Sequence, residues 1–164
     1  VDKVLREALD RGVVDAFTGY QTGQVDMVIR QVYTVWDALS RRDVRYSNIT
    51  ASAAANQMVQ SQHVRLIDQS INNAQANCVD GSVLMASLLR KIDIHPALVL
   101  VPGHCYLVFA LDREAKSLAG LETTMIGSKD ANYPPDPESD KIVGPKFARQ
   151  HSWLTFREIG RAHV

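Results

Sequence analysis

The sequence predicts an α+β fold in which N-terminal helices pack on an antiparallel sheet. Apolar residues recur at three- and four-residue spacing in two long segments between residues 24 and 91, which is the helical period. Segments rich in β-formers, separated by turn residues, follow between residues 97 and 124. Because helices come first and the strands follow through short connections, neighbouring strands are expected to pair antiparallel.

Length and charge limit the classes of protein to consider. A chain of 164 residues suits a single domain, and we expect residues 1–164 to form one, with its core at about 44–125. The net charge of zero gives no electrostatic reason to expect a nucleic acid or an anionic membrane as partner. No apolar run approaches the roughly 20 residues that span a bilayer. The sequence shows no signal peptide and leaves the compartment unknown.

The first third of the chain predicts two helices and a short extended segment. Residues 1–17 read as a short helix that ends near Gly12, and Gly19 to Gly23 reads as a break. Gln24 to Arg41 is the clearest helix, and Val44 to Ile49 alternates like a short strand. The apolar face of the clearest helix consists of Val25, Val28, Ile29, Val32, Trp36 and Leu39.

Two further helices are predicted before the sheet. Ser61 to Ile71 has a helical pattern, which asparagines then interrupt. Cys78 to Lys91 is a strong helix that also carries small residues suited to close packing.

Three strands and a long loop complete the predicted order. Leu98 to Val101 and His104 to Leu111 read as strands joined by a turn at Pro102-Gly103. Leu118 to Thr124 reads as the third strand. Residues 128–145 are polar and proline-rich and predict a loop, and the residues after it are expected to be partly helical.

Cys78 stands where a helix is predicted to begin, with Asn77 before it as a good N-cap. The unpaired amides and the positive dipole end of a helix stabilise a thiolate, and the same amides can hold an oxyanion. Asp80 works partly against this, because a nearby negative charge disfavours a thiolate. The simpler interpretation is a buried structural cysteine.

His104 follows 26 residues later (104 − 78), at the start of a strand. A strand end beside a helix N-terminus is a place where a base can meet a thiol. Alternation along the strand directs Cys105 away from His104, so Cys105 is read as a core residue. Two cysteines are too few for a disulfide-stapled scaffold, but a single disulfide between them stays open.

Glu122 lies 18 residues past His104 (122 − 104), on the predicted third strand. A carboxylate there could accept the second ring N–H of His104 and fix its tautomer, as the third member of a catalytic triad does. The alternative is an exposed strand glutamate. Asp112 is a rival acid, but eight residues of straight strand place it about 26 Å from His104.

The order of cysteine, helix, strand, histidine, strand and acid resembles the transglutaminase-like superfamily of bacterial type, a branch of the papain-like fold. The resemblance covers about residues 70–125, and Val44-Arg45-Tyr46 is similar to the extended segment that precedes this core. Two departures stand out: the third position is usually Asp and here is Glu122, and the residue after the histidine is often aromatic and here is Cys105. The matching residues are Asn77-Cys78-Val79-Asp80-Gly81, Lys91-Ile92-Asp93-Ile94-His95-Pro96-Ala97, Gly103-His104 and Glu122-Thr123-Thr124.

The resemblance implies acyl transfer on a peptide or protein substrate without a cofactor. Cys78 would attack an amide or ester carbonyl to give a thioester, and His104 would protonate the leaving group and then activate water or an amine. Water would make the chain a protease or amidase, which is slightly favoured, and an amine would make it a transglutaminase. The backbone N–H of Cys78 is the expected oxyanion donor. Candidate additional oxyanion or substrate-binding residues are Gln75, Asn77 and Tyr106.

Two other functions compete with this one. Cys78, His104 and Glu122 could ligate zinc, although no paired Cys-x-x-Cys or His-x-x-x-His spacing supports a metal site. Alternatively, the chain could be a catalytically inactive module that keeps the fold and binds peptide or protein partners, a possibility that the glutamate at the third position leaves open.

Overall fold

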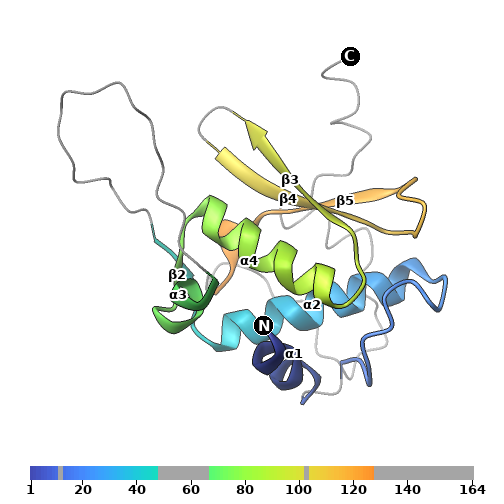
Figure 1. Ribbon diagram of the computed structural model, residues 1–164, viewed down its shortest axis with the longest axis horizontal. Helices are drawn as coiled ribbons and strands as arrows, with labels where there is room; N and C mark the ends of the chain where they lie inside the picture. Colours follow the sequence, from blue (N-terminus) through green and yellow to red (C-terminus); the bar gives the residue numbers. More distant parts are fainter. Residues whose placement is uncertain (11–12, 48–66, 102–103, 128–164) are drawn as a thin grey trace.

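The computed structural model describes residues 1–10, 13–47, 67–101 and 104–127. Helix α4 (Cys78–Lys91) lies between the main sheet and helix α2 (Val25–Arg41), and helix α1 (Asp2–Leu9) packs on α2 (Figure 1). The predicted turn at 102–103, the first part of the helix predicted at 61–71 and everything predicted after residue 127 lie outside the described residues. The elements in chain order are α1 (Asp2–Leu9), α2 (Val25–Arg41), β1 (Arg45–Tyr46), α3 (Ile67–Asn72), β2 (Gln75–Ala76), α4 (Cys78–Lys91), β3 (Pro96–Val101), β4 (His104–Ala110), β5 (Leu118–Leu121) and the 3-10 helix η1 (Thr123–Met125).

Helix α2 confirms the predicted apolar stripe in part: three of its six residues are buried, Ile29 and Trp36 are half-buried, and Val25 is exposed. Val28, Val32 and Leu39 are buried in the core, as the helical period requires. Val25, expected on the same face, is 43% exposed, because it is the first residue of the helix and extends past the neighbouring elements.

Helix α4 begins and ends where the sequence predicts. Asn77 is its N-cap: the side chain of Asn77 accepts a hydrogen bond from the amide of Asp80, and the Asp80 carboxylate accepts one from the amide of Asn77. The buried face of α4 packs on the sheet and on α2 (Figure 1). Its largest fully buried side chains are Leu84, Met85, Leu88 and Leu89.

The main sheet is antiparallel, in the order β3-β4-β5. Register pairs join Val101 to His104 and Leu107 to Leu121. The third strand is shorter than predicted, because the chain leaves the sheet after Leu121 and turns into η1. The turn is fixed by the carboxylate of Glu122, which accepts hydrogen bonds from Thr124.

A second, parallel strand pair was not predicted. β1 lies beside β2 with Arg45 opposite Gln75, so helices precede strands only with respect to the main sheet. The left-handed backbone of Ala74 (φ 52°) ends α3 and turns the chain into β2. Two-residue strands are too short for alternation to reveal. The pair places the segment before Cys78 against the chain that follows α2.

The hydroxyl of Tyr20 closes the far end of the hairpin between β3 and β4. It accepts a hydrogen bond from the His95 amide at 2.9 Å and donates one to the Ala110 carbonyl at 3.1 Å. His95 and Ala110 are opposite each other, and the Ala110 amide bonds to the His95 carbonyl. Tyr20 therefore stands in for the second hydrogen bond of this pair.

No helix in the described part of the chain is long and apolar enough to cross a membrane.

Candidate functional site

Three segments that carry predicted site residues meet at the N-terminal end of α4. The hydroxyls of Ser82 on α4 and Thr123 on η1 are 3.0 Å apart and buried. Gly81 allows this approach, because a Cβ at its position would lie 3.1 Å from the Thr123 hydroxyl oxygen. The start of β4 packs on the same helix, and Figure 1 shows all three segments at one side of the molecule.

His104 and Glu122 are brought together. The Nε2 atom of His104 lies 2.6 Å from Oε2 of Glu122, and the two side chains are 36% and 19% exposed. The other carboxylate oxygen, Oε1, accepts hydrogen bonds from the amide of Thr124 at 3.0 Å and from its hydroxyl at 2.8 Å. Both carboxylate oxygens are therefore occupied, which holds the histidine in one orientation.

Tyr106 supports the ring of His104 from within the same strand. The two ring centroids are 6.2 Å apart with an interplanar angle of 24°, a stacked arrangement. Tyr106 is buried, and alternation places both side chains on one face of β4. A role for Tyr106 toward substrate stays a prediction.

Cys78 is the first residue of α4 and has a half-buried, free thiol. The Asn77 side-chain oxygen is used by the Asp80 amide. The N–H groups of Cys78 and Val79 have no hydrogen-bond acceptor among the described residues. These are the amides that a helix start offers to an anion. Val79 is a residue that the sequence reasoning missed, and its position next to the cysteine in the first turn was the available signal.

Cys105 lies against the same end of α4, on the opposite face of β4 from His104. It is buried, as expected, and both cysteines are free thiols, so the disulfide left open by the sequence is not formed. Burial raises the pKa of the Cys105 thiol, a hydrogen bond with Ser82 opposes this, and negative charge on nearby Cys78 or Glu122 raises the pKa further. Cys105 is thus within electrostatic reach of both halves of the candidate site.

The thiol and the imidazole are not joined. Among the described residues, no hydrogen bond links Cys78 to His104, and the hydrogen bond of His104 is to Glu122. Catalytic hydrogen bonds of this kind often close only when substrate is bound. Gln75 is exposed on β2, two residues before the N-cap, and its part in the site stays a prediction.

Asp112, the rival acid, lies after the opposite end of β4. Its carboxylate accepts hydrogen bonds from the amides of Lys116 and Ser117, and these lower the pKa of Asp112. It therefore stabilises the turn between β4 and β5. The residues that the structure describes contain no group of three or more His, Cys, Asp and Glu side chains able to hold a metal ion, so the zinc alternative gains no donor set from them.

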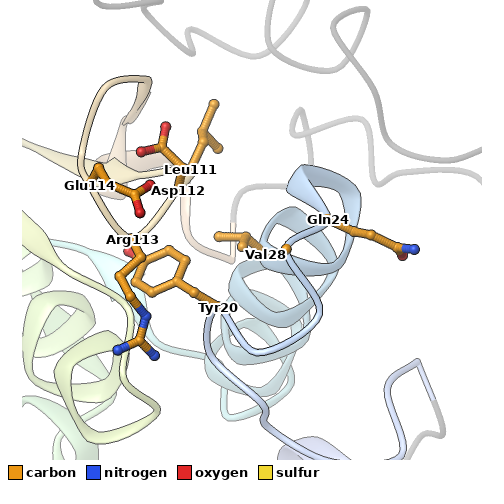
Figure 2. Close-up of a pocket in the computed structure, with 8 residues that line it drawn as sticks. Tyr20, Gln24, Val28, Leu111, Asp112, Arg113 and Glu114 are labelled. Carbon is orange, nitrogen blue, oxygen red and sulfur yellow. The ribbon is translucent and has the colours of Figure 1, made fainter.

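A pocket of about 250 Å³ lies at the same far end of β4, away from the candidate triad. Figure 2 shows Tyr20 and Val28 on one side of it and the turn with Asp112 and Arg113 on the other. Two of its polar groups are already engaged: the Tyr20 hydroxyl bridges the hairpin, and Asp112 binds turn amides. This pocket is therefore separate from the site built on Cys78.

Comparison of the chain with protein-family models, curated proteins and solved structures found no match. The transglutaminase-like resemblance accordingly stays a prediction that rests on this chain's own residues.

Proposed function

We propose that the chain transfers acyl groups from amide or peptide substrates through Cys78, His104 and Glu122 on a papain-like, transglutaminase-like core, with hydrolysis slightly favoured over transamidation. One observation carries the proposal: the 2.6 Å hydrogen bond from His104 to a carboxylate that is itself held by two further hydrogen bonds. An orienting acid behind a histidine is the arrangement that activates a nucleophile.

The hydrogen bond to Glu122 supports one assignment of the two ring nitrogens of His104. Nε2 carries the proton given to the carboxylate, which leaves Nδ1 as the atom that exchanges a proton with Cys78. Nδ1 takes the thiol proton as the sulfur attacks the substrate carbonyl carbon. The resulting oxyanion is held by the N–H groups of Cys78 and Val79 at the start of α4.

The tetrahedral species then collapses. His104 gives its proton to the leaving amine, the C–N bond breaks, and a thioester to Cys78 remains. Nδ1 next removes a proton from water, which attacks the thioester and releases a carboxylic acid and the free thiol. An amine in place of the water would give a new amide. Water is the acceptor present at every exposed site, which favours hydrolysis.

Thiol labelling tests this proposal without a known substrate. Cys78 is expected to react with iodoacetamide near pH 6 well ahead of Cys105, and His104→Ala and Glu122→Gln should each slow the reaction. His95→Ala and Glu114→Gln are matched controls, because both residues are exposed and lie away from the candidate triad. Equal and slow labelling of both cysteines in the unmodified protein would overturn the proposal.

A catalytically inactive module that binds a peptide or protein partner is the second candidate. It is favoured by the lack of a hydrogen bond between Cys78 and His104 among the described residues, and by Glu122 at a position where the family usually has Asp. Under this alternative Cys78 labels no faster than an ordinary thiol, and His104→Ala leaves its labelling rate unchanged.

A further inference from the structure

Strand β3 exposes an apolar edge. It is the first strand in the order β3-β4-β5, so no strand in the described part of the chain pairs with its outer side. Residues 96–101 carry no charge, and three of them are large and exposed: Leu98 at 43%, Leu100 at 74% and Val101 at 44%. Edge strands of monomeric proteins are commonly protected by charged side chains or prolines; this strand carries no charge and has one proline, Pro96, at its start.

The register shows which backbone groups face outward. The Ala110 amide bonds to the His95 carbonyl, so residue 95 directs its backbone groups at β4, and 97, 99 and 101 do the same by alternation. Residues 96, 98 and 100 therefore present theirs at the free edge. Pro96 has no N–H. The edge thus offers outward donors at Leu98 and Leu100.

We propose that this edge binds a second copy of the chain, with two β3 strands antiparallel about a two-fold axis at Val99. Leu98 of one copy then lies opposite Leu100 of the other, and each such pair exchanges two backbone hydrogen bonds. Both outward donors of each strand and the carbonyls of Leu98 and Leu100 are satisfied. The two three-stranded sheets become one continuous antiparallel sheet.

The side chains fit the same register. Leu98 and Leu100 pair with Leu107 and Cys105 on β4, so all four lie on the face that α4 covers. Across the two-fold axis, each exposed Leu98 meets Leu100 of the second copy and is removed from water. Because residues 96–101 carry no charge, no like charges meet in the pairing.

Other registers are less satisfactory. Centring the axis on Leu98 gives as many backbone hydrogen bonds but places Leu100 opposite Pro96, so fewer leucines meet a leucine of the second copy. The outward donors of Leu98 and Leu100 are symmetric about Val99, and a second copy brings a leucine to each exposed leucine, which is the reason to assign a second copy rather than an unrelated peptide. The contact is narrow, so the dimer should be weak.

Sedimentation velocity of the full chain tests the dimer at loading concentrations from about 5 to about 500 µM, a range that brackets weak interfaces. The unmodified protein should shift from monomer toward dimer as concentration rises. Leu98→Lys and Leu100→Lys should each weaken association about tenfold or more, because each lysine would lie opposite a leucine of the second copy and its charge would lose water. Val25→Lys is the matched control: Val25 is also 43% exposed but lies on α2, and its variant should dimerise normally.

Cross-linking tests the register. In a Cys78→Ser background, Val99→Cys should form an intermolecular disulfide on mild oxidation, because residue 99 faces itself across the axis in a close, non-hydrogen-bonded pair. Ala97→Cys should not, because residue 97 would lie opposite Val101. Circular dichroism confirms that each variant is folded.

Three outcomes would overturn the proposal. One is a monomer at every concentration, and another is a dimer that both lysine variants leave intact. The third is an edge that captures a synthetic peptide of residues 96–101 while the protein itself stays monomeric, which would assign the edge to an extended peptide instead.

Discussion

Glu122, the first residue after β5, contacts His104, the first residue of β4. Extending the β4–β5 register, in which Leu107 is opposite Leu121, places residue 122 opposite Tyr106 and one alternate position from His104. Diagonal neighbours in a sheet have Cα atoms roughly 7–8 Å apart, farther than direct neighbours. The extra methylene of glutamate spans this separation and gives the observed 2.6 Å contact. A glutamate side chain therefore suits the local geometry.

Shortening the Glu122 side chain should break its contact with His104. On the proposed function, Glu122→Asp and Glu122→Gln should each lower the rate of acyl transfer about 10³-fold, the first by losing reach and the second by losing charge and tautomer control. The measurement is hydrolysis of a mixed peptide pool followed by mass spectrometry. Glu114→Gln, an exposed glutamate beyond β4, is the control. Full activity in Glu122→Asp would show that the diagonal contact is dispensable.

Cys105 should be a slow thiol in the folded protein. Burial raises its pKa above the usual 9.0, so the reactive thiolate is scarce at neutral pH. At pH 8 we expect alkylation of Cys105 to be at least about tenfold slower in buffer than in denaturing urea. The label is located by peptide mapping, with Cys78 as the internal reference. Rapid labelling of Cys105 in the folded chain would contradict its burial against α4.

Removing the Tyr20 hydroxyl should weaken the fold. Tyr20→Phe leaves the His95 amide and the Ala110 carbonyl without their partner, which should lower the free energy of unfolding by about 1–3 kcal/mol. Urea denaturation followed by circular dichroism measures the loss. A change below about 0.5 kcal/mol would indicate that water replaces the hydroxyl.

The same residue predicts a pH dependence. Burial raises the pKa of Tyr20 above 10.0, its value in the unfolded chain, so the folded state holds the proton more tightly. Its contribution to stability is complete below pH 10 and is lost as pH rises through the folded-state pKa. The free energy of unfolding should therefore fall more steeply above pH 10 in the unmodified protein than in Tyr20→Phe. If the free energy of unfolding falls equally steeply above pH 10 in both proteins, groups other than Tyr20 cause the loss of stability.

The N-cap of α4 should matter for both stability and reactivity. Asn77→Ala removes the acceptor of the Asp80 amide and should cost about 1 kcal/mol of unfolding free energy. It should also slow alkylation of Cys78, because the first turn of the helix is less firmly held. Asn77→Ser keeps an acceptor and should recover most of both effects. If Asn77→Ala loses stability but labels normally, the cap acts on the fold alone.

Part of this architecture could be predicted because it is local. The helical period and the N-cap gave both ends of α4, and alternation with the Pro102-Gly103 pair gave the start of β4 at His104. Glu122 could be chosen over Asp112 because strand length alone places the two acids at opposite ends of the hairpin formed by β4 and β5. Each inference uses neighbours within a few residues or one strand.

The remainder depends on contacts between distant segments. The Tyr20 hydroxyl meets groups 75 and 90 residues away, and no local pattern marks a tyrosine for that role. The pairing of β1 with β2 involves two residues on each side, too few for a period to show. The end of β5 at Leu121 depends on the Glu122 carboxylate capping η1, a competition between strand and turn that propensity alone does not decide.

The bridge made by Tyr20 ties the segment between α1 and α2 to the sheet at the end opposite Glu122. Deleting residues 1–23 would therefore remove a brace of the hairpin as well as a helix. The amide proton of His95 would report this directly: bonded to a buried hydroxyl, it should exchange slowly with deuterated solvent, and the truncated chain should release it early.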